Sequence, residues 1–192
     1  QFNGVDPDTG LYEFEDFNGD GTISSPDDRQ VVKDLGPKFF GGFANQVSYK
    51  KFHLDILLQF TQQEGYNYRY STGIPGGMTN QPTEVLERWQ TVGDQSFIQR
   101  FSSGRDSEAR TAHSLYSNSH APVSDASYIR LKTLSISYEL ANRDKHGFGC
   151  ELFLRGQNLW TWTKYKGLDP ETQSMSSPPV LRMISLGTQL KF

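Results

Sequence analysis

Hydrophobic and polar residues alternate strictly along the last stretch of the chain, residues 181–192. One face carries Ile184, Leu186, Thr188, Leu190 and Phe192, and the other carries Met183, Ser185, Gly187, Gln189 and Lys191. Successive side chains of a β-strand point to opposite sides, so a period of two predicts a strand with one apolar face. Because this strand ends on the aromatic Phe192 and not on a polar tail, we expect it to be of the membrane-embedded kind.

The same alternation appears in four earlier stretches, which are residues 42–50, 52–61, 129–140 and 148–160. A tight turn near Lys50 and Lys51 is expected to join the first two. The phase of the apolar residues changes near Lys132, which predicts a β-bulge at that point. The sequence therefore predicts five antiparallel strands of about ten residues, the length that a tilted membrane-spanning strand needs.

The distribution of charge favours a membrane barrel over a soluble sheet. An arginine or lysine on the lipid face of a barrel costs about 2–4 kcal/mol at the bilayer midplane. The middle of the apolar phase carries no charged residue, whereas the opposite phase carries Asp55, Glu151 and Arg155. A soluble β-sandwich also alternates, but aromatic residues gather at both ends of these strands, as they do in the interfacial girdles of barrels.

Composition changes this interpretation little. The chain has 192 residues, 35% of them hydrophobic, and a net charge of -3. It has no run of about 18 apolar residues, which excludes a transmembrane helix, and the near-neutral charge without a basic cluster argues against nucleic acid as a partner. Cys150 is the only cysteine, so an intrachain disulfide is excluded.

Connections of unequal length suggest which side of the membrane each end of a strand faces. Short turns are expected at 50–51 and 141–147, and long external loops at 62–127 and 164–180. Barrels of outer membranes have short periplasmic turns and long external loops, which places the C-terminus on the periplasmic side. We therefore divide the chain into an external loop at 1–41 and C-terminal barrel strands at 42–192. Five strands cannot close in lipid, so the remainder of a barrel must complete them.

One loop has the spacing of a calcium site. Oxygen-bearing residues recur at alternate positions and then close the loop, and they are Asp16, Asn18, Asp20, Thr22 (through its carbonyl) and Asp27. This is the order of ligands in calcium-binding loops, with Gly21 at the sharp turn. Asp27 stands where a bidentate glutamate is usual, so weaker Ca²⁺ binding is expected unless Asp28 contributes. The alternative is a turn of Asx and glycine residues held by its own hydrogen bonds.

No reaction chemistry emerges from the remaining residues, and we do not expect an enzyme. His113 and Ser114 are adjacent, but no nucleophile motif surrounds them. Residues 82–90 predict one short helix within the long loop. Tyr66, Tyr68 and Tyr70 are candidates for stacking on sugar rings or gripping peptides, or they pack the loop against its neighbours.

Four segments carry a family resemblance, and they are Asp16–Ile23 with the following Asp27-Asp28-Arg29, Pro37–Phe43, Ser127–Tyr138 and Gly156–Glu171. In this order they resemble the C-terminal region of SusC/RagA-type TonB-dependent transporters. The resemblance covers nearly the whole chain, but the plug domain, the TonB box and the first part of the barrel have no counterpart here.

The resemblance implies the last five strands of an antiparallel transmembrane β-barrel of about 22 strands with long external loops. Such proteins lie in the bacterial outer membrane, contact its lipid and import glycan oligomers or peptides. Their partners are the remainder of the barrel and its plug, a SusD-like surface lipoprotein and the TonB complex. The competing interpretation is a soluble, calcium-stabilised β-sandwich module that binds carbohydrate.

Overall fold

The computed structural model describes residues 1–142 and 147–192. The chain divides into two compact units: unit 1 contains residues 1–34 and 66–124, and unit 2 contains residues 35–65 and 125–192. The short turn predicted at 141–147 falls mostly on residues outside the described ranges.

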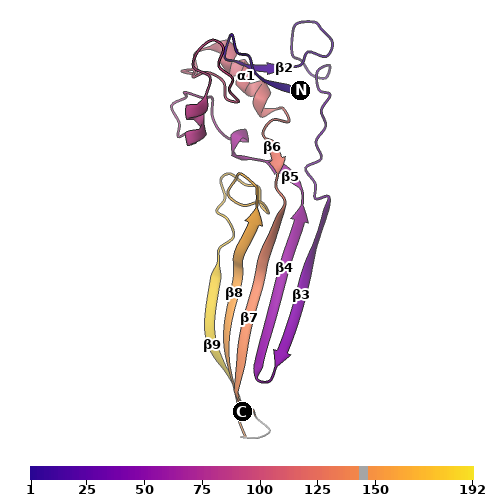
Figure 1. Cartoon of the computed structure of the whole chain (residues 1–192), viewed down its shortest axis with the longest axis vertical. Helices are drawn as coiled ribbons and strands as arrows, with labels where there is room; N and C mark the ends of the chain where they lie inside the picture. Colours follow the sequence, from indigo (N-terminus) through magenta and orange to yellow (C-terminus); the bar gives the residue numbers. More distant parts are fainter. Residues whose placement is uncertain (143–146) are drawn as a thin grey trace. The chain divides into compact units, whose positions relative to one another are not determined.

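Unit 2 is built on a five-stranded antiparallel sheet (Figure 1). Its strands, hydrogen-bonded in chain order, are β3 (Phe39–Tyr49), β4 (Phe52–Gln62), β7 (Tyr128–Ala141), β8 (Gly149–Thr163) and β9 (Met183–Lys191). All five predicted strands are thereby confirmed, with bounds shifted by a few residues. Lys50 makes the expected tight turn between β3 and β4 in a left-handed backbone conformation, with a φ of 55°.

The register of the sheet places the apolar side chains of all five strands on one face. The central row runs from Val47 of β3 through Leu54, Ile136 and Leu154 to Leu186 of β9. The adjacent row on the other face is polar and contains Gln46, Asp55, Ser135, Arg155 and Ser185. Leu186 is 80% exposed, as expected of a face that meets lipid.

The strand β7 contains the bulge that the change of phase predicts. Leu57 pairs with Thr133 and Leu58 pairs with Leu131, so Lys132 lies between them as an extra residue. The bulge returns the apolar residues at the start of β7 to the apolar face. On the neighbouring strand β8, Asn158 has a φ of 51° next to a second irregularity, and asparagine tolerates this left-handed conformation better than most residues.

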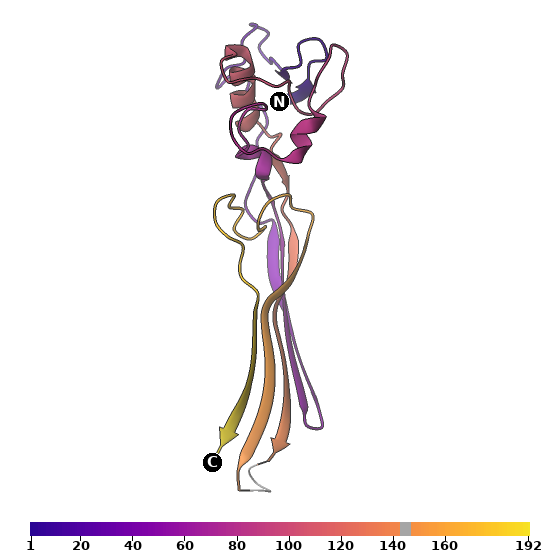
Figure 2. The same cartoon turned by 90° about the vertical axis from the view of Figure 1, so that its left-hand side faces the viewer.

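The five strands form a single twisted layer (Figure 2). A β-sandwich requires two sheets packed face to face. The described ranges contain this five-stranded sheet and two sheets of only two strands each. Among the same residues, no helix is long and apolar enough to cross a membrane. The larger unit is therefore built on one antiparallel sheet, as predicted.

Unit 1 has a small aromatic core. It contains the paired strands β1 (Phe2–Val5) and β2 (Tyr12–Phe14), the 3₁₀ helices η1 (Tyr68–Tyr70) and η2 (Thr83–Glu87), and helix α1 (Ser107–Ser117). Tyr12 of β2 stacks on Tyr116 of α1 with ring centroids 4.4 Å apart, and Phe2 meets the same ring edge-on at 5.2 Å. The short helix predicted at 82–90 is η2, whereas α1 is not anticipated by the sequence analysis.

The stretch 62–127, predicted as a long external loop, contains all three of these helices. The short strands β5 (Glu64–Tyr66) and β6 (Val123–Asp125) pair with each other near its two ends. The sheet of unit 2 begins at Phe39, three residues before the predicted start of the barrel strands at 42. The external position of residues 1–41 and 62–127 stays a prediction.

Candidate functional site

A buried arginine marks the polar face of the sheet near the start of β7. Arg130 lies in a cross-strand row between Gln59 of β4 and Thr161 of β8, and its side chain is 1% exposed. Its Nε donates a hydrogen bond to Oγ1 of Thr161 at 2.9 Å. The guanidinium also lies 5.3 Å from the ring centroid of Tyr128, within the range of a cation–π interaction.

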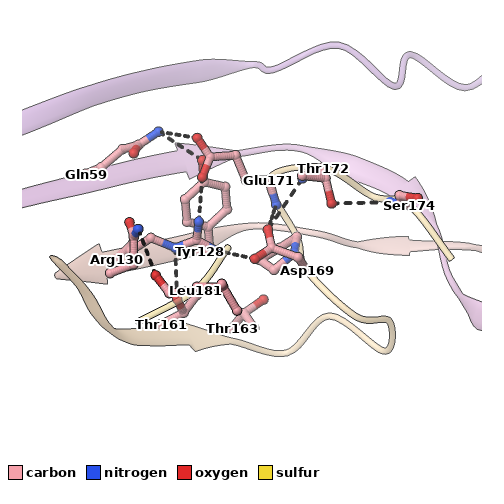
Figure 3. Close-up of polar contacts among 12 residues, drawn as sticks. Gln59, Tyr128, Arg130, Thr161, Thr163, Asp169, Glu171, Thr172, Ser174 and Leu181 are labelled. Atoms are coloured by element: carbon pink, nitrogen blue, oxygen red, sulfur yellow. Dashed lines mark hydrogen bonds and ion pairs between the residues drawn. The ribbon is translucent and has the colours of Figure 1, made fainter. Parts of the chain in front are cut away.

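Two carboxylates from one connection neutralise this arginine. The connection between β8 and β9 folds back over the polar face, and Figure 3 shows Asp169 and Glu171 directed at Arg130. Nη2 donates to Oδ2 of Asp169 at 2.8 Å, and Nη1 donates to Oε2 of Glu171. The Asp169 side chain is 4% exposed, whereas that of Glu171 is 31% exposed.

Asp169 also organises the turn that carries it. Its Oδ1 accepts hydrogen bonds from the backbone N–H groups of Glu171 at 2.8 Å and Thr172 at 3.4 Å. The backbone N–H of Gln173 donates to the carbonyl of Asp169 at 2.9 Å. This is the local side-chain-to-backbone bonding that aspartate provides in tight turns. One carboxylate therefore bonds both to the turn and to the strand.

Further bonds join the turn to β4 and β7. Nε2 of Gln63 donates to the carbonyl of Pro170 at 2.7 Å, and Nε2 of Gln59 donates to Glu171 at 3.4 Å. Nζ of Lys132 lies 3.5 Å from Oε2 of Glu171. We call Arg130, Lys132, Asp169 and Glu171 the Arg130 cluster.

The Arg130 cluster is balanced in charge, with two cations and two anions. Burying an ion pair is costly, and the cost is repaid only when the geometry is good and the remaining donors are satisfied. Here every nitrogen of the guanidinium has a partner, so the arrangement stabilises the turn. Removing one member of such a buried pair costs about 3–5 kcal/mol. The geometry suits structural anchoring of the turn.

The residues predicted to bind calcium lie in one loop of unit 1. Asp16 accepts hydrogen bonds from the backbone N–H groups of Gly19 and Gly21, each at 2.7 Å. Asp20 accepts from the N–H of Thr22 at 2.8 Å, and Asn18 accepts from the N–H of Asp20 at 3.1 Å. The carboxylates thus curl the loop around themselves, and calcium binding stays a prediction.

Asp28, rather than the predicted Asp27, closes this loop by hydrogen bonding. Its carboxylate accepts from the backbone N–H groups of Ser24 at 2.7 Å and Phe17 at 2.8 Å. Both hydrogen bonds lower the pKa of Asp28, and the bond from Ser24 has the larger effect. The described residues contain no group of three or more histidine, cysteine, aspartate or glutamate side chains placed to hold a metal ion.

The other sequence candidates belong to unit 1, whereas the Arg130 cluster belongs to unit 2. The rings of Tyr66 and Tyr70 are 4.2 Å apart at their centroids, and Tyr70 is 47% exposed. Nε2 of His113 lies 3.1 Å from the carbonyl of Thr72, and burial lowers the pKa of this histidine. The carbonyl of the adjacent Ser114 accepts hydrogen bonds from Asn118, one from its backbone N–H and one from its side chain.

The Arg130 cluster is not predicted from the sequence, although its parts are visible there. Arg130 falls on the polar phase of β7, and both carboxylates lie in the segment that carries the family resemblance. A charged residue two positions into a strand usually indicates a solvated strand end. Its pairing with residues about 40 positions away is a tertiary contact without a local signal.

Comparisons with known proteins agree with this architecture. No family model matches the chain. It is 36% identical over 165 residues to the TonB-dependent receptor P26 of Formosa agariphila, which covers 83% of this chain and 16% of that receptor. It is 26% identical over 186 residues to the TonB-dependent receptor SusC of Bacteroides thetaiotaomicron, which covers 93% of this chain and 17% of SusC.

Solved structures also match this chain. The RagAB peptide transporter matches the whole chain with a TM-score of 0.74 at 25% identity, and the chain spans 22% of that protein. RagAB structures in an open-open and a closed-closed state match with TM-scores of 0.71 and 0.72.

The sheet and its two faces define a segment of an outer-membrane β-barrel. With the relatives now described, the chain is a region of a TonB-dependent receptor of the SusC and RagA type. It spans roughly a fifth of the length of the proteins that it matches, as expected of a partial, C-terminal region.

Proposed function

We propose that this chain forms part of the barrel wall of a transporter that imports nutrients, either glycan oligomers or peptides, across the outer membrane with energy supplied through TonB. The observation that carries the proposal is the continuous apolar face of five long strands, backed by a polar face with charged side chains. A sheet of this kind separates lipid from a wet lumen. The likeness to a peptide importer supports transport as the activity.

The proposal includes partners and an orientation. Both edges of the five-stranded sheet, β3 and β9, need strands beyond those described here, because unpaired backbone groups are not tolerated in lipid. The rest of the barrel and a plug would supply them, and a SusD-like lipoprotein would cover the outer mouth. The short turn at Lys50 would face the periplasm, as would the C-terminus, while unit 1 would lie outside the cell.

Calcium binding at the loop of Asp16 to Asp28 is part of the proposal. The loop carries oxygen donors at alternating positions, and a carboxylate oxygen that accepts one N–H group keeps a second lone pair for a cation. Calcium would there brace an external loop and take no part in transport chemistry.

Growth on single nutrients tests the import function. We would delete the gene for the receptor that contains this chain and supply a tryptic digest of casein, or purified oligosaccharides one at a time, as the carbon source. The deletion is expected to stop growth on one class, and plasmid-borne receptor is expected to restore it. Equal growth of the deletion and parent strains on every peptide and glycan would contradict the proposal.

A further inference from the structure

The turn of residues 167–173 bonds directly to strands β4 and β7 of the sheet, and to β8 only through Arg130. Arg130 of β7 binds Asp169 and Glu171, and Gln63, which follows β4, binds the carbonyl of Pro170. The bond from Arg130 to Thr161 adds β8 to the same network. Loops of barrels are commonly held by few contacts and move freely, so this degree of attachment calls for an explanation.

Close packing at the far side of the turn also indicates that the turn is firmly attached. A Cβ placed at Gly65 would lie 2.3 Å from Oε1 of Gln173, the flexible end of a side chain of the turn. The side chain of Gln173 therefore lies directly against the backbone of Gly65 in β5. Asp169 is 3% exposed, so its charge depends on Arg130 for compensation.

We propose that Arg130 is a positioning residue of the import path, which fixes the turn 167–173 on the polar face as a permanent part of the lumen wall. This rests on the proposed function, because the polar face is the lumen side only in a transporter barrel. The fixed turn sets the place of Glu171, whose side chain is 31% exposed and lies 3.5 Å from Nζ of Lys132 on β7. The turn does not open and close during import.

Hydrogen exchange of the whole receptor, purified from outer membranes in mild detergent, tests the positioning role. We would compare the wild type with Arg130→Met and Arg130→Lys by mass spectrometry of peptides covering 164–176. The methionine variant is expected to exchange at the backbone amides of Glu171 and Gln173 at least about tenfold faster, because their partner Asp169 loses its anchor. Peptides from the other end of the β3–β4 hairpin, residues 43–55, should not change.

The lysine variant separates charge from geometry. Lysine keeps the positive charge but lacks the planar fork that serves two carboxylates and a hydroxyl at once. Its exchange is expected to lie between those of the wild type and the methionine variant. Arg100→Met is the matched control, since Arg100 pairs with Asp106 at 2.7 Å in unit 1, where both side chains are one-third exposed. It should leave peptides 164–176 unaffected.

Each outcome decides the proposal. Faster exchange confined to the turn, together with slower growth on the nutrient that the receptor imports, supports it. Unchanged protection of the turn overturns it, and so does a loosened turn with import intact. If Arg130→Met fails to fold, as judged by its mobility on unheated gels, Glu171→Gln replaces it, with a smaller increase expected. The exchange result does not depend on whether any nutrient is imported, so failure of the proposed function is detected separately.

Discussion

A single arginine placed on either face of β7 would test which face meets lipid. Thr133 and Leu134 are neighbours in the strand and point to opposite sides. Leu134 pairs with Ile56 and Gly156 on the apolar face, and Thr133 pairs with Leu57 and Gln157 on the other. Leu134→Arg and Thr133→Arg therefore add the same side chain at the same depth, in environments that differ only by the face of the sheet.

The expected magnitude follows from depth. The strand β7 has 14 residues, which at a rise of about 3.4 Å and a tilt of about 45° span about 34 Å along the membrane normal. Leu134 lies halfway along and thus near the bilayer midplane, where arginine costs about 2–4 kcal/mol. That cost lowers the equilibrium constant for folding by about 30- to 700-fold. Thr133→Arg should cost well under 1 kcal/mol on a wet face.

Heat modifiability provides the assay. Folded barrels resist detergent and migrate faster on unheated gels, so the fraction in the fast band can be followed against urea for each variant of the full receptor. The midpoint for Leu134→Arg should fall clearly below that for Thr133→Arg, which should match the wild type. Equal midpoints for the two variants, or a lower one for Thr133→Arg, would refute the assignment of the faces.

Three further predictions concern unit 1. Tyr116→Ala removes a side chain that is 3% exposed and should destabilise the unit by about 3–5 kcal/mol, seen as rapid hydrogen exchange in α1, whereas Tyr116→Phe should have little effect. Asp106 caps α1, and its pKa is lowered mainly by the hydrogen bond that it accepts from the backbone N–H of Ala109. Protection of α1 from hydrogen exchange should therefore be full above about pH 4 and should fall as the pH drops through this lowered pKa. Asp106→Asn should remove this pH dependence and still cap the helix. Millimolar calcium should release heat on binding to the receptor, and Asp16→Asn combined with Asp20→Asn should abolish that heat; calorimetry without any signal in the wild type would contradict calcium binding.

The strands of the sheet could be predicted because their signal is local. Alternation fixes both the element and its face, and a break in phase at Lys132 is enough to locate a bulge. Each of these features is decided by residues within a few positions of each other. A membrane sheet strengthens the signal further, since charge is excluded from one face over its whole length.

Unit 1 could not be predicted in the same way because it is assembled from distant segments. Nε1 of Trp89 donates to the carbonyl of Pro7 at 2.9 Å, and the N–H of Arg100 donates to the carbonyl of Gly10 at 2.8 Å. Gly10 has a φ of 70° and leaves room for the ring of Trp89. Such contacts join residues about 80 to 90 positions apart and leave no periodic trace, so residues 62–127 resembled one long loop.

The Arg130 cluster lies between these two cases. Ile129 and Leu131 belong to the apolar face, so the alternation correctly sends Arg130 to the polar side. Polarity alone would leave this arginine solvated, yet it is among the most buried side chains of the described residues. Water is replaced there by Asp169 and Glu171, whose connection appears in the sequence as an ordinary loop rich in glycine, proline and serine. Arg130 of the sheet therefore holds this loop by its two carboxylates, and these carboxylates in turn allow a full charge to be buried against the sheet.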